Sequence, residues 1–389
     1  MINKLMVTEK IYFDANATTP MHQRALAAWN RVETECWYNP SSPFREGGRA
    51  RRVLREARET LAGILGEGEE ARLVFTSGAT EANNMVLRWA AEQSARGVHR
   101  PGLLVGGAEH PAVRESALAY WPEAEIFVCP VQRDGRVDLR EWERLLAGEK
   151  PGFATLMAAN NETGILQPWQ EAARLCAEAG VGYHCDAVQL PGKASLEGLP
   201  QCPFYTLSAH KFGGPKGCGV LRVPTRENSF HGQRGGEQEG GVRSGTEAPA
   251  LAAAMAEALT EVREKWETWA PESGEGRALF EEVLRQTIPG VQILGEGVPR
   301  LTNTSFVIFP QGDQLRWVRL LDRQGVMAST GAACATAKEG PSHVLAAMGY
   351  EAMEARRSVR FSGLPQYGKA EWEFAAKAVA GAWQKISPA

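Results

Sequence analysis

A lysine and a histidine stand directly after an apolar run, in positions where their side chains could do chemistry. The run FYTLS (204–208) is followed by Ala209, His210 and Lys211 and then by a glycine-rich segment. A lysine that follows a buried strand is poorly solvated, which favours its neutral, nucleophilic amine. Such an amine suits a Schiff base with a cofactor aldehyde, and Ser208 and His210 could donate hydrogen bonds to a phosphate. The alternative is a solvated loop lysine without a chemical role.

Small and hydroxyl-bearing residues mark a second candidate site, between an apolar run and a helical pattern. The run RLVFTSG (72–78) leads into Ala79 and Thr80, where the helical pattern begins. Hydroxyl groups and free N–H groups at a helix N-terminus bind anions. The spacing of a Walker phosphate loop is absent, and the alternative is an ordinary helix cap.

Two further side chains could contact a flat cofactor ring. His110 follows the apolar run GLLVGG (102–107) and could stack on such a ring. Asp186 ends the run VGYHCD (181–186), where an acid is unfavourable unless it has a partner. A pyridinium nitrogen would be such a partner, and the acid would keep the ring protonated as an electron sink. The alternatives are a capping or surface histidine and a helix-capping aspartate.

A thiol and a guanidinium complete the candidate set. Cys334 lies among small residues in STGAACAT (329–336), a segment without a clear period, which is typical of a loop that presents a cysteine. Arg360 lies in the alternating run SVRFS (358–362), and an inward-pointing arginine on a strand would suit bidentate binding of a carboxylate. The alternatives are an inert structural cysteine and an arginine on the solvent face.

These candidates need elements that bring them together, and the sequence between about residues 70 and 225 predicts such elements. Continuous apolar strands separated by helices predict an α/β fold with a mostly parallel central sheet flanked by helices. Ligands bind such sheets at the carboxyl ends of the strands, where the polar motifs of this stretch fall. The predicted strands are 72–78, 102–107, 125–129, 153–159, 181–186 and 204–208, and the predicted helices include 80–95, 138–147 and 168–179.

The length of 389 residues exceeds what one hydrophobic core usually organises, so we predict two domains. The large domain would span 21–262, and a smaller α+β domain would comprise 1–20 and 263–389, with the Cys334 loop. Six glycines within 232–245 predict a mobile or tightly turned surface loop. A helical pattern over 247–269 could bridge the domains. Beyond it we predict a strand in 302–309 and helices over 312–324, 341–348 and 370–385.

Composition excludes several classes of protein. Hydrophobic residues make up 43% and charged residues 23% of the chain, as in soluble globular proteins. A net charge of −3 gives no support for nucleic-acid binding, and no apolar run is long enough to span a membrane. The seven cysteines are scattered without a CxxC pair, which disfavours a zinc site or a disulfide framework and fits the cytoplasm. The N-terminal residues show no signal-peptide pattern.

The motifs taken together resemble the cysteine desulfurases of the NifS and IscS type, in the class V branch of fold-type I pyridoxal-phosphate enzymes. The resemblance extends from YFDANATTP (12–20) to RFS (360–362), which is most of the chain. The Ser-x-His-Lys sequence at 208–211 and the small residues around Cys334 are its most specific elements. Further matches are NPSS (39–42), NNETG (160–164) and RSGT (243–246).

The resemblance implies pyridoxal 5′-phosphate as the cofactor and a role for each matched residue. Lys211 would bind the cofactor covalently, and Cys334 would receive sulfur as a persulfide. His110 would stack on the cofactor ring and assist proton transfer. Asp186 would pair with the pyridine nitrogen, and Gln189 would bond the ring O3′. Other matched residues would bind the phosphate (Ala79, Thr80, Ser208, His210 and, in the neighbouring subunit, Thr246) or the substrate (Asn161, beside the cofactor, and Arg360).

The resemblance also implies a reaction and partners. L-cysteine would be converted to L-alanine by a homodimer with shared sites, and the sulfur would pass to an acceptor or scaffold protein, for iron–sulfur clusters or other products. No resident metal is implied, although Cys334 could ligate an iron–sulfur cluster transiently. The sulfur acceptor stays open. A selenocysteine lyase or related β-lyase would use the same cofactor site, and a non-catalytic scaffold would retain only the fold.

The sequence departs from the family pattern at a few positions. Ala209 replaces the usual glycine, Phe44 stands where many members have histidine, and Ala332 and Ala335 replace hydroxyl residues near the cysteine. These differences leave the core roles intact and bear on the cysteine loop, partner docking and substrate preference. The spacing from Cys334 to the Pro-Ser-His at 341–343 resembles the long-loop group and not the SufS-like group.

Overall fold

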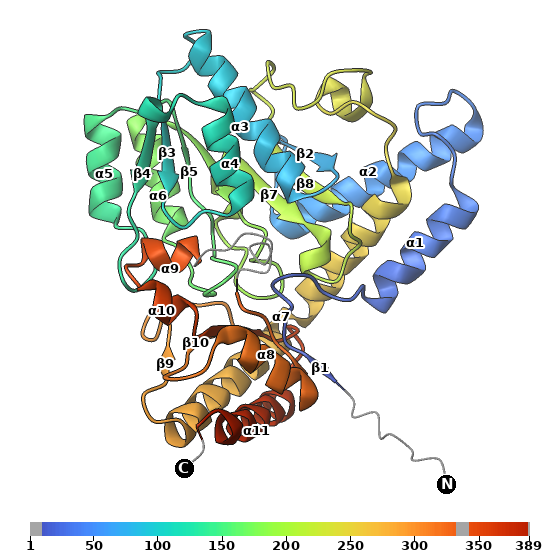
Figure 1. Cartoon of the computed structure of the whole chain (residues 1–389). Helices are drawn as coiled ribbons and strands as arrows, with labels where there is room; N and C mark the ends of the chain where they lie inside the picture. Colours follow the sequence, from blue (N-terminus) through green and yellow to red (C-terminus); the bar gives the residue numbers. More distant parts are fainter. Residues whose placement is uncertain (1–9, 332–341, 388–389) are drawn as a thin grey trace. The chain divides into compact units, whose positions relative to one another are not determined.

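Two units make up the chain. The computed structural model describes residues 10–331 and 342–387 (Figure 1). The sheet unit comprises 18–160 and 166–266, and the C-terminal unit comprises the described parts of 1–17, 161–165 and 267–389. The domain boundaries predicted from the sequence, at residues 20 and 262, stay a prediction.

A seven-stranded sheet is the centre of the sheet unit. Its strands are β2 (Ala71–Thr76), β3 (Leu103–Gly106), β4 (Ile126–Cys129), β5 (Phe153–Thr155), β6 (Gly182–Asp186), β7 (Phe204–Ser208) and β8 (Gly219–Pro224). The order is β2-β8-β7-β6-β5-β3-β4, and the five strands from β7 to β4 run parallel. Strand β8 is antiparallel to both neighbours, so β2 points the same way as the parallel strands. The prediction of a mostly parallel sheet is confirmed.

Helices connect these strands and cover the sheet (Figure 1). Every residue of β7 and β8 is buried, which requires cover on both faces and explains their continuous apolar sequence. Helix α3 packs against β7 and β8, and α6 packs against β6. The helices of this unit are α1 (Gln23–Glu35), α2 (Arg45–Leu65), α3 (Ala79–Ala95), α4 (Pro111–Tyr120), α5 (Leu139–Gly148) and α6 (Trp169–Ala179), with short 3₁₀ turns η1 (Glu123–Glu125), η2 (Leu199–Gln201), η3 (Ala209–Lys211) and η4 (Gln238–Gly241).

The glycine-rich segment 232–245 is turned tightly against the edge strand β2. Glu239 and the two glycines after it have φ between 51° and 77°, a left-handed conformation that glycine adopts readily. The carboxylate of Glu239 accepts hydrogen bonds from Phe75 N at 3.1 Å and from Arg58 at 2.7 Å. Of the two sequence-based alternatives for this segment, the tightly turned one is observed.

The C-terminal unit is an α+β arrangement. It contains an antiparallel sheet of β9 (Gln292–Ile293), β10 (Thr304–Ile308) and β12 (Ser358–Ser362), with β10 in the middle. A second, parallel pair joins β1 (Ile11–Tyr12) to β11 (Val326–Met327). Its core combines aliphatic side chains with large aromatic ones, among them Phe280, Trp317, Phe361 and Trp372. The helices are α8 (Gln314–Arg323), α9 (His343–Ala347), α10 (Ala352–Ala355) and α11 (Lys369–Ile386).

Helix α7 (Pro249–Thr287) belongs to both units and continues beyond its predicted end. The sequence pattern ended this helix at Trp269, before Pro271, and that boundary is wrong. A proline inside a helix costs roughly 3 kcal/mol because it removes one hydrogen bond and crowds the preceding turn. The residues after it include Phe280 and Leu284, which are buried in the core of the C-terminal unit. Their burial outweighs the local cost.

Two further expectations concern the whole described chain. Among the described residues, no helix combines the length and the apolar composition that membrane crossing needs. The six cysteines described are all buried and free, as expected for small hydrophobic side chains (Cys36, Cys129, Cys176, Cys185, Cys202 and Cys218).

Candidate functional site

The predicted site residues of the sheet unit gather where its parallel strands end. Asp186 is the last residue of β6, and Ser208 is the last residue of β7. Lys211 ends the 3₁₀ turn after β7, and His110 lies four residues beyond the end of β3. Because β3, β6 and β7 are parallel, these positions share one edge of the sheet. The predicted placement of the motifs at the carboxyl ends of strands is confirmed.

The turn that carries Lys211 is held by residues from the N-terminal part of the sheet unit. Thr19 N donates to His210 O at 2.8 Å, and Gly213 N donates to Thr19 Oγ1 at 2.8 Å. Gly213 has a φ of 85°, and a Cβ atom added there would lie 2.3 Å from the ring of His22. A larger residue would therefore displace the turn. The two bonds and this close contact fix the backbone on either side of Lys211.

His210 lies in an electropositive environment. Burial, followed by the nearby charges of Lys211, Lys193 and Lys216, lowers the pKa of His210 to about 4. The ring is therefore neutral at pH 7, and its Nδ1 lies 3.0 Å from Thr18 Oγ1. Three lysines close enough to shift this histidine make this edge of the sheet suitable for an anion.

The start of α3 adds hydrogen-bond donors to the same edge. Gly78 precedes the helix with a φ of 149°, and a Cβ atom at this position would lie 3.8 Å from Ser208 Oγ. Ala79 and Thr80 are the first two residues of the helix, where N–H groups have no partner within the helix and the helix dipole is positive. These donors fit a phosphate group, with the Ser208 hydroxyl beside them.

Glu81 connects this turn to a distant motif, and sequence reasoning missed it. Its carboxylate accepts hydrogen bonds from Ser77 N at 2.6 Å and from Arg243 Nε at 2.7 Å. Burial raises the pKa of Glu81, but the bonds from Arg243 and Ser77 outweigh burial and lower it. Thr246 is exposed three residues beyond Arg243. The pair therefore anchors the RSGT segment on the turn that precedes α3.

The Asp186 carboxylate is buried and accepts hydrogen bonds at both oxygens. Oδ1 accepts from Val188 N at 3.2 Å, and Oδ2 accepts from Asn83 Nδ2 at 2.7 Å. A carboxylate can accept about four hydrogen bonds, so it retains capacity for a pyridinium N–H. A carboxylate acceptor at this position fits the protonated ring nitrogen of pyridoxal phosphate. Asn83, on α3, was not found from the sequence because it lies about a hundred residues away.

A neutral histidine lies beside Asp186 on the same strand. His184 precedes Asp186 by two residues, so both side chains share one face of β6. Its Nδ1 lies 2.9 Å from Thr155 Oγ1, and its Nε2 lies 3.0 Å from Thr206 Oγ1. Burial lowers the pKa of His184 to about 4, although the charge of Asp186 opposes this shift.

This histidine predicts a loss of stability in acid. The pKa of His184 is about 4 in the folded protein and about 6.5 when unfolded. Between these values the unfolded chain binds more protons, so stability falls as the pH drops through this window, by roughly 3 kcal/mol in total. His210, whose pKa is also lowered, acts with the same sign.

Urea unfolding followed by tryptophan fluorescence at about pH 7.5 and about pH 4.5 measures this effect. The difference between the two midpoints is expected to shrink in His184→Asn, which cannot be protonated. An unchanged difference in that variant would exclude His184 as a source of the acid sensitivity.

His110 caps a helix and also borders a hollow. Its Nδ1 accepts a hydrogen bond from Ala112 N at 3.1 Å, at the start of α4. The ring lines a cavity of about 350 Å³ that Thr80 also lines. The capping alternative is therefore observed, and it leaves the ring beside the same hollow as Thr80, which is predicted to bind phosphate. Because Nδ1 accepts a hydrogen bond, Nε2 is the nitrogen that carries the proton in the neutral ring.

The residue before His110 contributes a buried carboxyl group. Glu109 is fully buried, and its Oε1 accepts a hydrogen bond from Met157 N at 2.5 Å. Burial, and then the charge of Asp186, raise the pKa of Glu109 well above its usual range. Burial therefore favours the neutral form of Glu109, which carries no negative charge toward Asp186.

Gln189 is held by a buried lysine that the sequence analysis did not single out. Lys193 Nζ donates to Gln189 Oε1 at 2.7 Å, and both side chains are buried. A lysine has only donors, so the Gln189 oxygen must face it and the NH₂ group must point elsewhere. A donor from Gln189 fits the predicted bond to the ring O3′.

Arg360 is buried in the C-terminal unit, so the solvent-face alternative is wrong. Its Nη2 donates to Asp14 Oδ1 at 2.5 Å, and its Nη1 donates to the carbonyl oxygens of Asn161 at 2.8 Å and Gly331 at 3.0 Å. In the described part of the chain its buried Nε has no hydrogen-bond partner. One edge of the guanidinium therefore retains a donor for a carboxylate, although its role as a substrate clamp stays a prediction.

The remaining predicted residues divide between the units or lie outside the description. Asn161, predicted to contact both cofactor and substrate, and Arg360 lie in the C-terminal unit, and the other predicted cofactor residues lie in the sheet unit. Cys334 lies outside the described residues.

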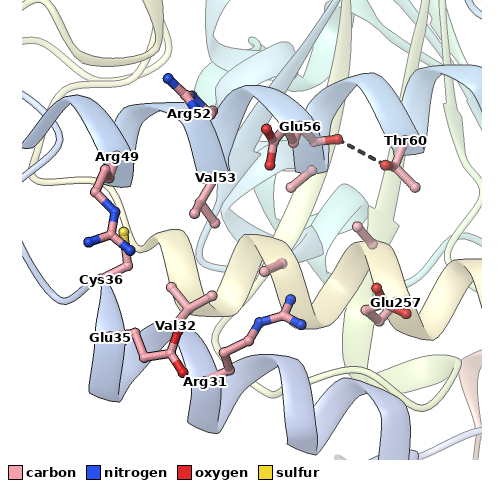
Figure 2. A pocket seen from close by; sticks show the side chains of 13 residues that line it. Arg31, Val32, Glu35, Cys36, Arg49, Arg52, Val53, Glu56, Thr60 and Glu257 are labelled. Carbon is pink, nitrogen blue, oxygen red and sulfur yellow. Dashed lines mark hydrogen bonds between the residues drawn. The ribbon is translucent and has the colours of Figure 1, made fainter. Parts of the chain in front are cut away.

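A different hollow in the sheet unit, of about 420 Å³ between α1, α2 and α7, contains none of the predicted residues (Figure 2). It is lined by side chains of both charges, among them Arg31, Arg49, Arg52, Glu35, Glu56 and Glu257.

The sequence is similar to curated cysteine desulfurases along most of its length. The family model described as aminotransferase class-V matches residues 11–371. The cysteine desulfurase of Cereibacter sphaeroides is 35% identical over 362 residues, which cover 91% of this chain and 90% of that protein. The cysteine desulfurase NifS of Azotobacter vinelandii is 32% identical over 357 residues, covering 90% and 87%.

Solved structures agree with these relatives. A NifS-like protein from Rickettsia africae superimposes with a TM-score of 0.86 at 27% identity, covering 97% of this chain and 100% of that one. A structure of SspA in complex with cysteine has a TM-score of 0.76 at 27% identity and covers 92% and 99%. The chain therefore belongs to the aminotransferase class-V family, within its group of NifS-like cysteine desulfurases.

Proposed function

We propose that this protein is a pyridoxal-phosphate-dependent cysteine desulfurase. It would convert L-cysteine to L-alanine and collect the sulfur as a persulfide on Cys334. The observation that carries the proposal is the edge of the central sheet, where Lys211, the α3 N-terminus and Asp186 meet within one unit. Family membership and a fold neighbour that binds cysteine support the choice of substrate.

The residues of this edge fit each part of the cofactor. The N–H groups of Ala79 and Thr80, with Ser208 and His210, would hold the phosphate. Asp186 would pair with the ring nitrogen, His110 would cover the ring, and Gln189, with Asn161 nearby, would bond the ring oxygen. When bound, pyridoxal phosphate supplies an electron sink for a substrate carbanion.

Lys211 and Cys334 would carry the chemistry at their own atoms. Lys211 Nζ would hold the cofactor covalently, and after the substrate amine replaces it, the same atom would move the substrate α-proton, with help from His110. The Cys334 thiolate would attack the sulfur of L-cysteine, because only the thiolate is nucleophilic. The carbon–sulfur bond would break, sulfur would remain on Cys334, and a proton would complete alanine. Arg360 would bind the substrate carboxylate through its guanidinium edge.

The proposal extends to the oligomeric state, the cellular location and the partner of the protein. Thr246 is exposed and anchored through Arg243, which suits a residue that reaches the phosphate site of a second copy in a homodimer. We place the protein in the cytoplasm, where its free cysteines would stay reduced. A sulfur-acceptor or scaffold protein would take the persulfide sulfur from Cys334.

An assay of the purified protein with L-cysteine, added cofactor and a reductant tests the function. Alanine and protein persulfide are expected together, and selenocysteine serves as the rival substrate. Cys334→Ala is expected to bind the cofactor normally, to form no persulfide and to lose alanine release at least about a hundredfold, because the nucleophile is absent. Alanine release by this variant at the wild-type rate would exclude Cys334 as the sulfur acceptor.

A further inference from the structure

A buried amide contacts the acid that is predicted to face the cofactor ring. Asn83 is fully buried on α3, and its Nδ2 donates to Asp186 Oδ2 at 2.7 Å. The other carboxylate oxygen of Asp186 accepts from Val188 N at 3.2 Å. One donor therefore comes from the strand's own continuation, and the second comes from a separate helix. Together they fix the plane of the carboxylate, since each oxygen has a partner.

The side-chain oxygen of Asn83 indicates why this position has an amide and not an apolar side chain. Its Oδ1 is buried and has no hydrogen-bond partner within residues 10–331 and 342–387. A buried acceptor without a partner is unfavourable, and a leucine of similar size would avoid that penalty. The N–H donor toward Asp186 is the gain that offsets it. Packing alone does not explain asparagine here.

The place of Asn83 on its helix links both ends of the cofactor site. Asn83 follows Thr80 by three residues, so the two lie on neighbouring positions of one helix face. The first turn of α3 offers N–H groups to the predicted phosphate site, and the next turn holds Asp186. One rigid helix thus sets the separation between the phosphate site and the acid.

We propose that Asn83 is a positioning residue that orients the Asp186 carboxylate toward the ring nitrogen of the cofactor. The proposal rests on the proposed function, because it assumes that pyridoxal phosphate binds at this edge. With Asn83 Nδ2 and Val188 N each holding one oxygen, the remaining lone pairs of Asp186 would be available to the ring N–H. Without the amide donor, the Asp186 carboxylate can rotate. Its hydrogen bond to the ring nitrogen of the cofactor would then be weaker.

The test compares two cofactors that differ at the ring nitrogen alone. Apoprotein of the full chain is titrated with pyridoxal phosphate and with its deaza analogue, in which carbon replaces that nitrogen, and binding is followed by tryptophan fluorescence. The wild type is expected to prefer pyridoxal phosphate. In Asn83→Leu this preference should fall about tenfold, because a hydrogen bond to a charged group is lost. Asn83→Asp, which keeps the size but replaces the donor by an acceptor, should lower it as well.

A matched control separates positioning from folding. Gln93→Leu removes another buried polar side chain of α3, at the opposite end of the helix, and should leave the preference unchanged. If both Asn83 variants weaken binding of the two cofactors equally, Asn83 is merely structural and the proposal is overturned. If the wild type binds neither cofactor, the proposed function itself fails, which is a different outcome.

Discussion

Replacing Lys211 with alanine is expected to abolish the absorbance band that arises from the covalent bond between lysine and cofactor, and to lower alanine release from L-cysteine roughly a thousandfold or more. The reason is that one amine is assigned both the covalent bond to the cofactor and the movement of the substrate proton. The fold should survive, because backbone bonds to Thr19 hold the turn on either side of this side chain. The measurements are an absorbance spectrum after reconstitution and a single-turnover alanine assay.

The matched control for this prediction is Lys216→Ala. Lys216 is an exposed lysine five residues away in the same loop, and its charge also acts on His210. This variant should keep the spectrum and most of the activity. A normal spectrum in Lys211→Ala would show that another amine holds the cofactor, and the assignment of Lys211 would be wrong.

Replacing Arg360 with methionine is expected to have two separate effects. The first is on stability: the variant leaves Asp14 and the carbonyl oxygens of Asn161 and Gly331 without their donor. Breaking a buried ion pair by removing one partner costs about 3 to 5 kcal/mol. Because Asp14 is about a quarter exposed, water replaces part of the lost bond and the lower end is expected. Thermal unfolding of the full-length variant, compared with the wild type, measures this effect.

The second effect of Arg360→Met is on substrate binding, and it is expected as a large rise in the KM for L-cysteine. Arg360→Lys keeps the charge but loses the planar fork, so it should recover some stability but little substrate affinity. Arg357→Met, which removes a partly buried arginine that bonds Pro310 O, is the control for general damage to this region. An unchanged KM in a folded Arg360→Met protein would assign the arginine to structure alone.

Local sequence patterns were sufficient for six of the seven strands of the central sheet, all except β8, and for the positions at their carboxyl ends. The run at 204–208 coincides with β7, and the runs at 181–186 and 125–129 lie within one residue of β6 and β4. Buried parallel strands are continuous apolar segments, so their signal is local. Since parallel strands end at one edge, the positions of Asp186 and Lys211 followed directly from their places in the chain.

Residues that act through long-range contacts could not be predicted in this way. Asn83 and Lys193 carry no local signal that distinguishes them from other polar residues on helices and loops. Each becomes meaningful only through a partner that the fold brings near, such as Asp186 for Asn83. A weak signal did exist for Glu81, because an acid three residues after a helix cap often bonds backward to the backbone.

Tertiary packing explains the remaining differences. The predicted helix ended before Pro271, whereas α7 continues through this residue. Local propensity opposes a helix at proline, and the burial of Phe280 and Leu284 that compensates for it is visible only in the fold. For His110, the capping interpretation and the cofactor interpretation were treated as alternatives, but they are compatible. One ring can cap α4 through Nδ1 and border the cavity with its other side.

The carboxylate of Glu239 has a consequence for the behaviour of the protein at high concentration. Together with Arg58, which donates to Leu73 O at 2.9 Å, it occupies main-chain groups on the outer side of β2. An unprotected outermost strand is a template on which another molecule can add a strand of its own. Here two charged side chains already bond main-chain groups of β2, so the addition of a strand from another molecule at this edge of the sheet is opposed.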